Sequence, residues 1–531
     1  MIDSDGVAAP EAEKPVPAYS WYALSVLVIV YVLNFIDRQI LSILANDIKA
    51  DLGVDDSYLG FLYGTAFAIF YALFGIPLGK LADSWKRVRL MTLGLTLWSA
   101  MTAVSGLARD TTTLTVARIG VGVGEATASP SAYSLISDWF PARLRATALA
   151  IYSSGIYIGG GVSLAIGGLV VDNWNSAFPD GGPLGLAGWQ AAFIAVGLPG
   201  LLLALWVFSL KEPARGAIDG LNTPEDAHPF RGFVQELFTV IPGFTFFGAA
   251  ARGIKALLLN VAVFFLVLSA AYVISAMLGS GPGLIVPVIT DQWLLLAIGY
   301  YSVFSWATAL RKRDYPTFAL TWGSPAFMCT ILGYGTVAFM AYSASYWGAP
   351  YAERVFGVSK VVLGFWLGGG GALGGFLGVI LGGRMADYLF TRTHAGRIWV
   401  VLFGLLSPIP FAVIQFTTNS FTLFAILNVV VGALAASALG AAAASSQALV
   451  LPRMRGVATA TFFLATTLVG LALGPYMAGY VSALNEGDLS AGVLSTLAIT
   501  PVGFVLLVSA IKLVPAAYLT VLERARAAGE P

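Results

Sequence analysis

Long apolar stretches alternate with short polar ones along almost the whole chain. Each apolar stretch has about 20 residues or more, enough for an α-helix to cross the roughly 30 Å hydrocarbon core of a bilayer. The pattern therefore predicts about fourteen membrane-spanning helices. Their approximate ranges are 20–44, 57–79, 89–108, 113–136, 146–171, 189–210, 254–278, 288–310, 321–347, 360–382, 397–416, 420–446, 456–483 and 492–515.

The composition supports the same fold class. Of the 531 residues, 58% are hydrophobic and only 11% are charged, and the mean hydropathy is +0.81. A soluble chain of this length would need far more charged residues to cover its surface. We therefore predict an all-α polytopic membrane protein. Its first apolar stretch is too long for a signal-peptide core and is expected to be retained.

Basic residues predict the orientation, because short cytoplasmic loops carry an excess of Lys and Arg. If both termini are cytoplasmic, most of the 29 Lys and Arg lie on the cytoplasmic side. We expect an integral protein of the cell (inner, cytoplasmic) membrane with both termini in the cytoplasm. The exceptions are Lys49, Arg109, Arg354 and Lys360 on the opposite side, and Arg38 and Arg118 within predicted helices.

Two repeated motifs indicate an internal duplication. "GKLAD" at 79–83 returns as "GRMAD" at 383–387, and "FPARLRATALAI" near Pro141 is echoed by "LPRMRGVATATF" near Pro452. Transporter folds built from two parallel repeats place the substrate site between the halves, near the bilayer midplane. A channel needs no such duplication, although a duplication does not exclude one.

The duplication divides the chain into two six-helix bundles of nearly equal length, separated by an insert. Two extra crossings restore the original side of the membrane, so both bundles have the same orientation. The predicted parts are a cytoplasmic tail at 1–19, the N-terminal bundle at 20–210, a cytoplasmic linker plus two extra helices at 211–320, the C-terminal bundle at 321–515 and a cytoplasmic tail at 516–531.

Two motifs of the N-terminal bundle resemble the major facilitator superfamily. "GKLADSWKRVR" at 79–89 resembles its loop signature between helices two and three, apart from Lys86, where a glycine is usual. "RIGVGVGEATASPS" at 118–131 resembles its helix-four signature, with Arg118 at the arginine position. The resemblance implies the major facilitator fold, here with two inserted helices, and secondary transport rather than enzymatic activity.

A narrower resemblance is to the spinster family of sphingolipid and lysolipid transporters. It rests on four motifs taken together, and in the C-terminal bundle on the repeat signatures and "YWGAPY" at 346–351. This resemblance implies an amphipathic lipid substrate. The four motifs are "NFIDR" at 34–38, "GVGEA" at 122–126, "DWFP" at 138–141 and "KEPARG" at 211–216.

Four charged residues, Asp37, Arg38, Arg118 and Glu125, lie within predicted helices. Each would cost about 2.5–3.5 kcal/mol if left ionised and unpaired at mid-membrane. Asp37 and Arg38 point about 100° apart around one helix and do not face each other. Arg118 and Glu125 lie two turns apart on one face, about 10 Å along the axis. In the superfamily that the chain resembles, helices one and four line the central cavity, which makes the pairs Asp37–Arg118 and Arg38–Glu125 possible.

We interpret these four residues as a proton-coupling switch. Burial favours the neutral acid and a nearby arginine favours the anion, so a carboxylate that loses its arginine during rocking can take up a proton. A static ionic clamp between two helices is the alternative. Asn34 lies one turn before Asp37 and could donate a hydrogen bond to its carboxylate, or only make a polar helix contact.

One further group of residues is a candidate for contact with the substrate, and another is a candidate for a gate on the cytoplasmic side. Packing is the alternative for the aromatic residues, and a solvated turn is the alternative for the gate. The predicted substrate contacts are Asn34, Arg38, Glu125, Tyr342 and Trp347, with Tyr63 and Asn428 as further candidates. The predicted cytoplasmic gate consists of Gly79, Asp83, Arg87, Arg145, Asp387 and Arg455, in which acids near helix ends pair with loop arginines when that side is closed.

Glycine runs at 154–161 ("SGIYIGGG") and 367–375 ("LGGGGALGG") predict closely packed helices, because small residues let helices approach. Helices that part sideways to admit a lipid are the alternative. His228 and His394 lie in predicted loops without acidic or cysteine partners at ligand spacing, and Cys329 is the single cysteine. No metal site, cofactor, catalytic base or internal disulfide is predicted.

The sequence thus predicts a proton-coupled secondary active transporter that works by alternating access. By resemblance, its substrate is an amphipathic lipid such as a sphingoid or lysolipid. A drug/proton antiporter, and a small organic anion symporter that uses Arg38 or Arg118 as an anion clamp, remain alternatives. The expected partners are the substrate, protons and membrane lipids, with no nucleic acid, and the protein is expected to be a monomer.

Overall fold

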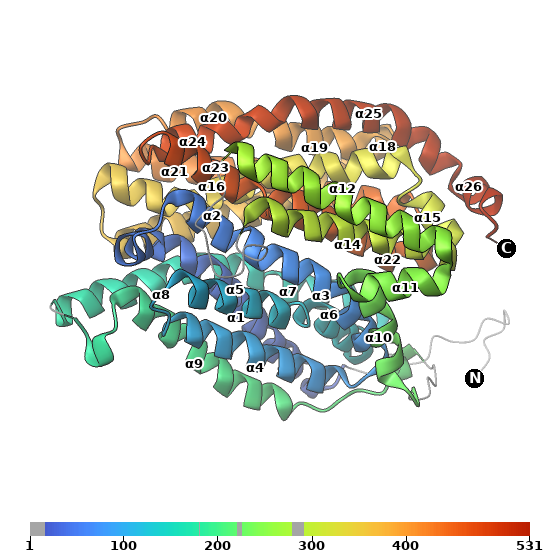
Figure 1. Cartoon of the computed structure of the whole chain (residues 1–531), viewed down its shortest axis with the longest axis horizontal. Coiled ribbons are helices and arrows are strands. Elements are labelled where there is room, and N and C mark those ends of the chain that lie inside the picture. The colour runs from blue at the N-terminus through green and yellow to red at the C-terminus, as the bar shows by residue number, and fades with distance from the viewer. Residues whose placement is uncertain (1–15, 180, 220–225, 279–290, 531) are drawn as a thin grey trace, which may run out of the picture.

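The chain folds into a bundle of long helices that lie side by side (Figure 1). The computed structural model describes residues 16–179, 181–219, 226–278 and 291–530. Every regular element in these residues is a helix, so the predicted all-α fold class is confirmed. Most of the predicted tail 1–19 and the first residues of the predicted span 288–310 lie outside the described residues.

Helices α1 to α9 make up what we call the N-half. Several predicted spans consist of two helices in sequence, because one or two residues interrupt the helical geometry. Gly64, for example, separates α2 from α3 with φ −85° and ψ −85°. The helices are α1 (Ala18–Leu52), α2 (Asp56–Tyr63), α3 (Thr65–Ser84), α4 (Arg87–Ser105), α5 (Thr111–Glu125), α6 (Ala128–Trp139), α7 (Ala142–Ser153), α8 (Gly155–Ala177) and α9 (Gly188–Phe208), with a short 3-10 helix η1 (Pro183–Gly185).

The insert between the halves contains more helix than the sequence indicates. The sequence pattern predicts a polar linker before the two extra helices, whereas the structure forms two short helices there, α10 and α11, bent by 96°. Gly243 lies between them at φ 90°, a conformation that favours glycine. The elements are η2 (Ala217–Asp219), α10 (Pro229–Val240), α11 (Phe244–Arg252), α12 (Ile254–Leu278), α14 (Gln292–Arg313) and α15 (Tyr315–Leu320).

The C-half follows from α16 to α25, and a final helix, α26 (Val521–Ala527), lies within the predicted tail. Two predicted spans contain π-helical stretches, named η3 and η5. The remaining elements are α16 (Pro325–Phe356), α17 (Lys360–Leu363), η3 (Gly364–Gly368), α18 (Gly369–Arg392), α19 (Gly396–Leu406), α20 (Pro408–Gln415), α21 (Phe421–Ala448), η4 (Pro452–Met454), α22 (Arg455–Ala465), η5 (Thr466–Leu471), α23 (Gly474–Leu484), α24 (Leu489–Ser495), η6 (Thr496–Ile499) and α25 (Thr500–Leu519).

All fourteen predicted spans are helical, but they are not equally apolar. Among the described residues, twelve helices are long and apolar enough to cross a membrane, or thirteen if α10 and α11 count as one bent span. The predicted spans 89–108 and 113–136 are not among them. Their helices are α4, which carries several Thr and Ser residues, and α5, which has 15 residues and contains Arg118 and Glu125. Both pack inside the N-half, where α4 lies against α5 and α9.

The two halves meet most extensively at one end of the bundle. We call the end that carries α10, α11 and α26 the near end, and the opposite end the far end (Figure 1). At the far end α2 packs on α23, α1 on α16, and α8 on α17 and η3. A Cβ atom at Gly60 would lie 2.4 Å from the Pro475 carbonyl oxygen, and one at Gly479 would lie 2.2 Å from that of Asp56. Only glycine permits this approach of the two backbones.

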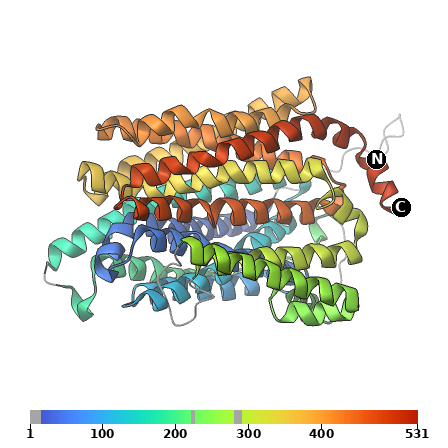
Figure 2. The same cartoon turned by 45° about the horizontal axis from the view of Figure 1, so that its top comes forward.

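The insert lies beside both halves. Figure 2 shows the green helices α12 and α14 alongside blue N-half and red C-half helices. Helix α14 packs on α3 of the N-half and on η5 of the C-half, and α12 packs on the outer side of α14. Most side chains of α12 are not buried, whereas α14 is largely covered.

Candidate functional site

Arg38 and Glu125 form an ion pair between α1 and α5. Arg38 Nε lies 2.5 Å from Glu125 Oε2, and the Glu125 side chain has no exposed surface. Three aromatic rings surround the Arg38 guanidinium, with its Cζ 5.1, 4.7 and 4.6 Å from the ring centroids of Phe35, Phe67 and Tyr71. Aromatic faces attract a cation, so the rings and the carboxylate together stabilise the buried charge. The predicted pair Arg38–Glu125 is confirmed.

The predicted ion pair between Asp37 and Arg118 is not formed. Arg118 Nη1 donates instead to the Asp37 backbone oxygen at 3.1 Å, and both side chains are completely buried. The Asp37 carboxylate faces Thr102 and Trp98 of α4. Within the described residues, the Asp37 carboxylate, the Thr102 hydroxyl and the Trp98 indole N–H make no hydrogen bond. A buried carboxylate without a hydrogen-bond partner is unusual in a native protein.

Glycines on α5 bring these side chains together. A Cβ at Gly122 would lie 2.6 Å from the Phe67 oxygen of α3, and one at Gly124 would lie 2.7 Å from the Trp98 nitrogen of α4. The motif "GVGEA" therefore allows α5 to contact α3 and α4 directly. Because Glu125 is the last residue of α5, this contact fixes the depth at which its carboxylate meets Arg38.

Asn34 lies beside Glu125, one turn before Arg38 on α1. Among the described residues, neither its buried Nδ2 group nor Glu125 Oε1 makes a hydrogen bond. Asn34 approaches the Glu125 carboxylate, so the predicted hydrogen bond to Asp37 is not observed. Two buried polar atoms without partners therefore lie next to each other at the Arg38–Glu125 pair.

Aromatic residues of the two halves contact each other near the Arg38–Glu125 pair. Tyr63 donates a hydrogen bond to the Gln39 side-chain oxygen, and its ring stacks on Tyr346 with the centroids 4.2 Å apart. Gln39 Nε2 donates to Ser345 Oγ of the C-half at 3.1 Å. Tyr342 lies one turn before Tyr346 on the same face of α16 and is partly exposed. Tyr63 thus lies where the halves meet and Tyr342 lies one turn away from that contact, while their contact with substrate stays a prediction.

Trp347 and Asn428 lie elsewhere. Trp347 is completely buried, and its indole N–H donates to the Pro475 oxygen at 2.9 Å. It packs against the far-end contact of the halves and cannot touch a ligand in this conformation. Asn428 Nδ2 donates to the Leu367 oxygen at 3.4 Å within the C-half. In this conformation both residues therefore make packing contacts, which was the alternative to contact with the substrate.

An ionic network that the sequence analysis did not single out closes the far end. Arg354 of α16 contacts both oxygens of the Asp56 carboxylate, at 2.7 and 2.8 Å. Lys49 and Ser482 also donate to that carboxylate, each at 2.8 Å. Nearby, Lys360 pairs with Asp47 at 3.1 Å and with Glu353. Three of the four basic residues expected outside the cytoplasm belong to this network, namely Lys49, Arg354 and Lys360. Their unusual placement is the sequence feature that could have indicated the network.

The predicted gate residues lie at the near end, and their partners belong to their own half or to the insert. Arg87 is completely buried and pairs with Asp138 and, at 2.8 Å, with Glu212. Arg145 pairs with Asp219 at 2.9 Å. In the C-half, Asp387 lies 3.6 Å from Arg397, and both Asp387 and Arg455 are exposed. Within the described residues, the gate acids Asp83 and Asp387 therefore make no ion pair with Arg145 or Arg455.

Gly79 lies within α3, and the turn between α3 and α4 does not depend on glycine. A Cβ at Gly79 would only touch Pro130, at 3.9 Å. Trp85 and Lys86 connect α3 to α4 in extended conformations with negative φ. Lys86, which stands where the resembled signature has glycine, therefore fits this turn without strain.

The two glycine runs pack against each other across the halves. A Cβ at Gly368 would lie 2.3 Å from the Gly161 oxygen, and one at Gly364 would lie 2.6 Å from the Ala165 Cα. Gly369, by contrast, has no atom within 4 Å of its Cβ position. The close packing predicted for these runs is present between α8 and η3, at specific glycines rather than along the whole run.

Within the described ranges, no three His, Cys, Asp or Glu side chains come together in a way that could hold a metal ion. The side chains at the centre of the N-half are two arginines, two acids, an amide and several aromatic rings. This arrangement can hold a proton on a carboxylate, exchange arginine partners and bind a polar group.

Comparisons with known proteins agree with this geometry. The family description "Major Facilitator Superfamily" matches residues 27–365. An "MFS-type efflux pump" of Mycolicibacterium smegmatis is 26% identical over 97% of this chain and 94% of its own. A "Probable L-galactonate transporter" of Escherichia coli K12 is 32% identical, over 35% of this chain and 38% of its own.

A solved structure is similar over almost the entire chain. It is described as a bacterial homolog of the human lysosomal transporter Spinster, in an inward-facing and unoccupied conformation. The TM-score is 0.67 and the identity 26%, with 96% of this chain and 99% of that chain covered.

Proposed function

The chain belongs to the Major Facilitator Superfamily, and we propose that it is a proton-coupled secondary transporter that moves an amphipathic lipid, a sphingoid or lysolipid, by alternating access. One observation carries the proposal. The Asp37 carboxylate is completely buried, has no hydrogen-bond partner among the described residues, and lies next to an arginine that donates to its backbone instead.

Asp37 is the proton carrier in this proposal. A buried carboxylate that is ionised but not bonded is strongly unfavourable, so in this conformation Asp37 holds its proton. Arg118 needs only to move from the Asp37 backbone oxygen to the carboxylate to stabilise the anion and release that proton. A rocking motion that moves α5 against α1 would bring about this exchange of partners.

Glu125 and Asn34 receive the polar group of the substrate. Glu125 Oε1 and Asn34 Nδ2 are both buried and unbonded, and buried polar atoms normally have partners. A hydroxyl or ammonium group of a lipid headgroup would satisfy them while Arg38 keeps Glu125 Oε2. The acyl or sphingoid tail would then lie against the C-half, which has no ionisable residue in the middle of its predicted spans.

Ionic contacts between the halves support alternating access, and we propose that the near end is open in this conformation. Ionic contacts between the halves close the far end, the predicted gate pairs are not formed, and the similar solved structure is described as inward-facing. We propose that the near end faces the cytoplasm of the cell membrane, with both termini on that side. We also propose that the two bundles predicted from the sequence move as units.

A drug/proton antiporter is the second candidate, because the relative that matches almost the full chain is an efflux pump. The same proton site would serve it. A small organic anion symporter is less well supported. Arg38 is paired with Glu125, which leaves Arg118 as the candidate anion clamp, because its Nε is buried without a hydrogen-bond partner among the described residues.

Reconstitution in liposomes tests the proposal. Labelled lysolipids, sphingoid lipids, cationic dyes and a sugar acid are compared with and without a pH gradient. We expect saturable, gradient-dependent flux of the lipids. Flux of dyes alone would support the antiporter, and flux of the sugar acid alone would contradict the assignment of the substrate.

A further inference from the structure

Helix α14 of the insert bridges the two halves. On the N-half side, a Cβ at Gly299 would lie 2.6 Å from Ile69 Cδ1 of α3. On the C-half side, Tyr300 donates to the Leu468 oxygen and Gln292 to the Ala472 oxygen, both at 3.3 Å. The Trp293 ring also lies edge-on to Tyr476, with the centroids 6.0 Å apart. The helix therefore covers the seam between α3 and η5.

The π-helical geometry of η5 explains why a helix docks there. In a π-helix the hydrogen bonds run from residue i to i−5, as in the bond from Ala472 N to the Thr467 oxygen. Carbonyl groups around such a break need other partners, because the hydrocarbon supplies none. The Ala472 oxygen accepts from Thr65 of α3 at 2.6 Å and from Gln292 of α14. One C-half carbonyl thus binds both the N-half and the insert.

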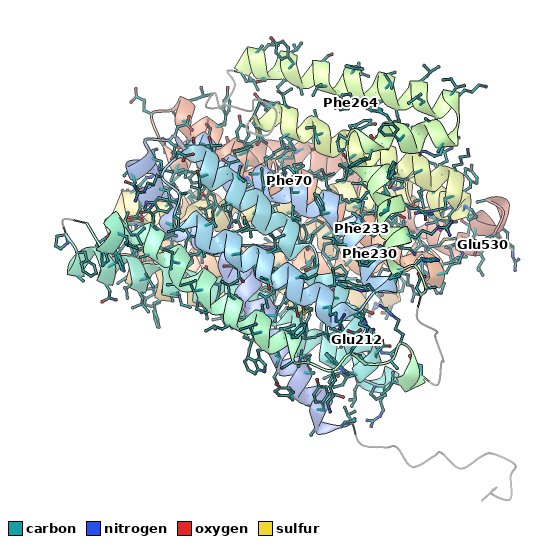
Figure 3. All side chains as sticks on the ribbon, turned by 60° about the horizontal axis from the view of Figure 1, so that its bottom comes forward. Phe70, Glu212, Phe230, Phe233, Phe264 and Glu530 are labelled. Carbon is teal, nitrogen blue, oxygen red and sulfur yellow. The ribbon has the colours of Figure 1, made fainter. Side chains whose placement is uncertain are left out.

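The near-end part of the insert is anchored to both halves as well. Ser84 at the end of α3 donates to the Pro229 oxygen at 2.7 Å, and the Trp85 and Phe230 rings lie 5.3 Å apart. Figure 3 shows Phe230 and Phe233 of α10 beside the N-half ribbon, and Phe264 of α12, whose ring lies 4.9 Å from that of Tyr301 on α14.

Two ion pairs complete the anchoring of the near-end part. Glu236 of α10 pairs with Arg313 at the end of α14 at 2.5 Å. The adjoining Asp314 pairs with Arg453 of the C-half at 2.8 Å. The insert thus forms a continuous wall from the far end to the near end.

The opposite seam has no such wall. There α8 packs on η3 and α18 through glycines, and Gly375 of α18 lies against the Tyr157 ring. Towards the near end, α7 packs on α1 and α6 of its own half. Its Ile151 side chain is 39% exposed.

We propose that the insert is a lateral seal, which excludes lipid tails from the seam between α3 and η5 and leaves the opposite seam, between α8 and α18, as their route. The seal follows from packing alone, whereas the route of the tail rests on the proposed lipid transport. The seal therefore determines from which side of the bundle a membrane-dissolved substrate reaches the Arg38–Glu125 pair.

A photoreactive phosphatidylcholine with a diazirine in its acyl chain tests the seal in proteoliposomes. We expect adducts on exposed α12 residues such as Phe265 and at least tenfold fewer on Ile69 of α3. Gly299→Leu, whose side chain would displace α14, should raise Ile69 labelling several-fold. The double variant Tyr300→Phe and Gln292→Leu removes the hydrogen bonds without added bulk and should act in the same direction.

Gly432→Leu is the matched control, because no atom lies within 4 Å of a Cβ at Gly432, and it should leave Ile69 labelling unchanged. Ile69 labelling equal to that of Phe265 in the unaltered protein would overturn the seal. So would unchanged labelling in both folded seal variants.

A lysolipid with the same diazirine tests the route. Competition by unlabelled lysolipid should reduce adducts on α8 and α18, and adducts on α3 or α22 would contradict the proposed route. If no lysolipid is bound or transported, the proposed function fails, while the phosphatidylcholine result still decides the seal.

Discussion

The Arg354 guanidinium donates to both oxygens of the Asp56 carboxylate, at 2.8 and 2.7 Å, and so joins α16 of the C-half to α2 of the N-half. The Asp56 side chain has no exposed surface, whereas Arg354 is 23% exposed. A carboxylate buried this completely depends on its partners. This pair, together with the Lys360–Asp47 pair, is therefore an electrostatic contribution to closure of the far end.

Removing Arg354 should open the far end. Breaking a buried ion pair on one side costs about 3–5 kcal/mol, and each 1.4 kcal/mol changes an equilibrium tenfold. Lys49 and Ser482 still contact Asp56, so we expect at least a tenfold shift with Arg354→Ala. The readout is maleimide labelling of Ser42→Cys in a Cys329→Ser background, because Ser42 is 1% exposed in this conformation.

Lys49→Ala is the matched control for that experiment, since Lys49 contacts the same carboxylate but is 32% exposed. Exposed pairs contribute about 0–1 kcal/mol, so the labelling rate should change much less. Exchanging the charges, Asp56→Arg with Arg354→Asp, should restore slow labelling. Equal effects of Arg354→Ala and Lys49→Ala would show that the pair does not hold the far end closed.

Asp37→Asn and Glu125→Gln should differ in stability although both should abolish pH-driven transport. Asp37 has no bonded partner within the described residues, so an amide of the same shape should fold with little change in melting temperature. Glu125→Gln leaves the Arg38 charge without its carboxylate and should cost about 3 kcal/mol or more. Thermal unfolding in detergent and flux in liposomes measure the two effects.

Two results would contradict that account of the switch. One is unchanged proton dependence in both variants, which would support a static clamp. The other is an Asp37→Asn variant as unstable as Glu125→Gln, because Asp37 would then be an essential ion of the fold. Substrate exchange without a gradient is the control, since it needs no net proton release and should survive in Asp37→Asn.

Two neighbouring glycines of the run at 367–375 should respond differently to substitution by alanine. Gly368→Ala places a Cβ 2.3 Å from the Gly161 oxygen, whereas Gly369→Ala meets no atom within 4 Å. We expect Gly368→Ala to lower the melting temperature and weaken closure between α8 and η3. Gly369→Ala should be neutral or slightly stabilising, because alanine favours helix over glycine. Equal effects in both would contradict close packing at Gly368.

The contact between the insert and the C-half should weaken only at low pH. Partial burial opposes ionisation of Asp314, but hydrogen bonds from Arg453 and Thr317 outweigh it and lower the pKa of this carboxyl from 3.8 to about 2. Because the pKa is lower in the folded state, the stabilisation is present above pH 3.8 and is lost as the pH falls towards 2.

Asp314→Asn should therefore be less stable than the unaltered protein at pH 7, by about 1 kcal/mol at most because the pair is largely exposed. The difference should shrink below about pH 4, as melting curves at several pH values would reveal. A difference that persists unchanged down to pH 3 and below would rule out titration of Asp314 as its cause.

Much of the fold was predictable because it depends on local patterns. Helices of about 20 apolar residues satisfy their own backbone within the bilayer, so the apolar stretches located most helices of the described residues, including the less apolar α4 and α5. The Arg38–Glu125 pair was predictable because two turns on α5 and the resembled fold fix the depth of Glu125. Residue spacing could not reveal α10 and α11, which pack on α3, α12 and α14.

The sequence by itself determined the helices, the duplication, the family and the four charges that need partners inside the membrane. Only the tertiary structure decided which partners they have. Arg118 bonds to the Asp37 backbone rather than its carboxylate, Asn34 lies beside Glu125 rather than bonding to Asp37, and Asp56 pairs with Arg354 at a distance of 298 residues along the chain. The spacing of residues along the chain determines which side chains share a face only within one helix. Partners across helices depend on how closely the backbones approach, which the glycines permit but do not specify.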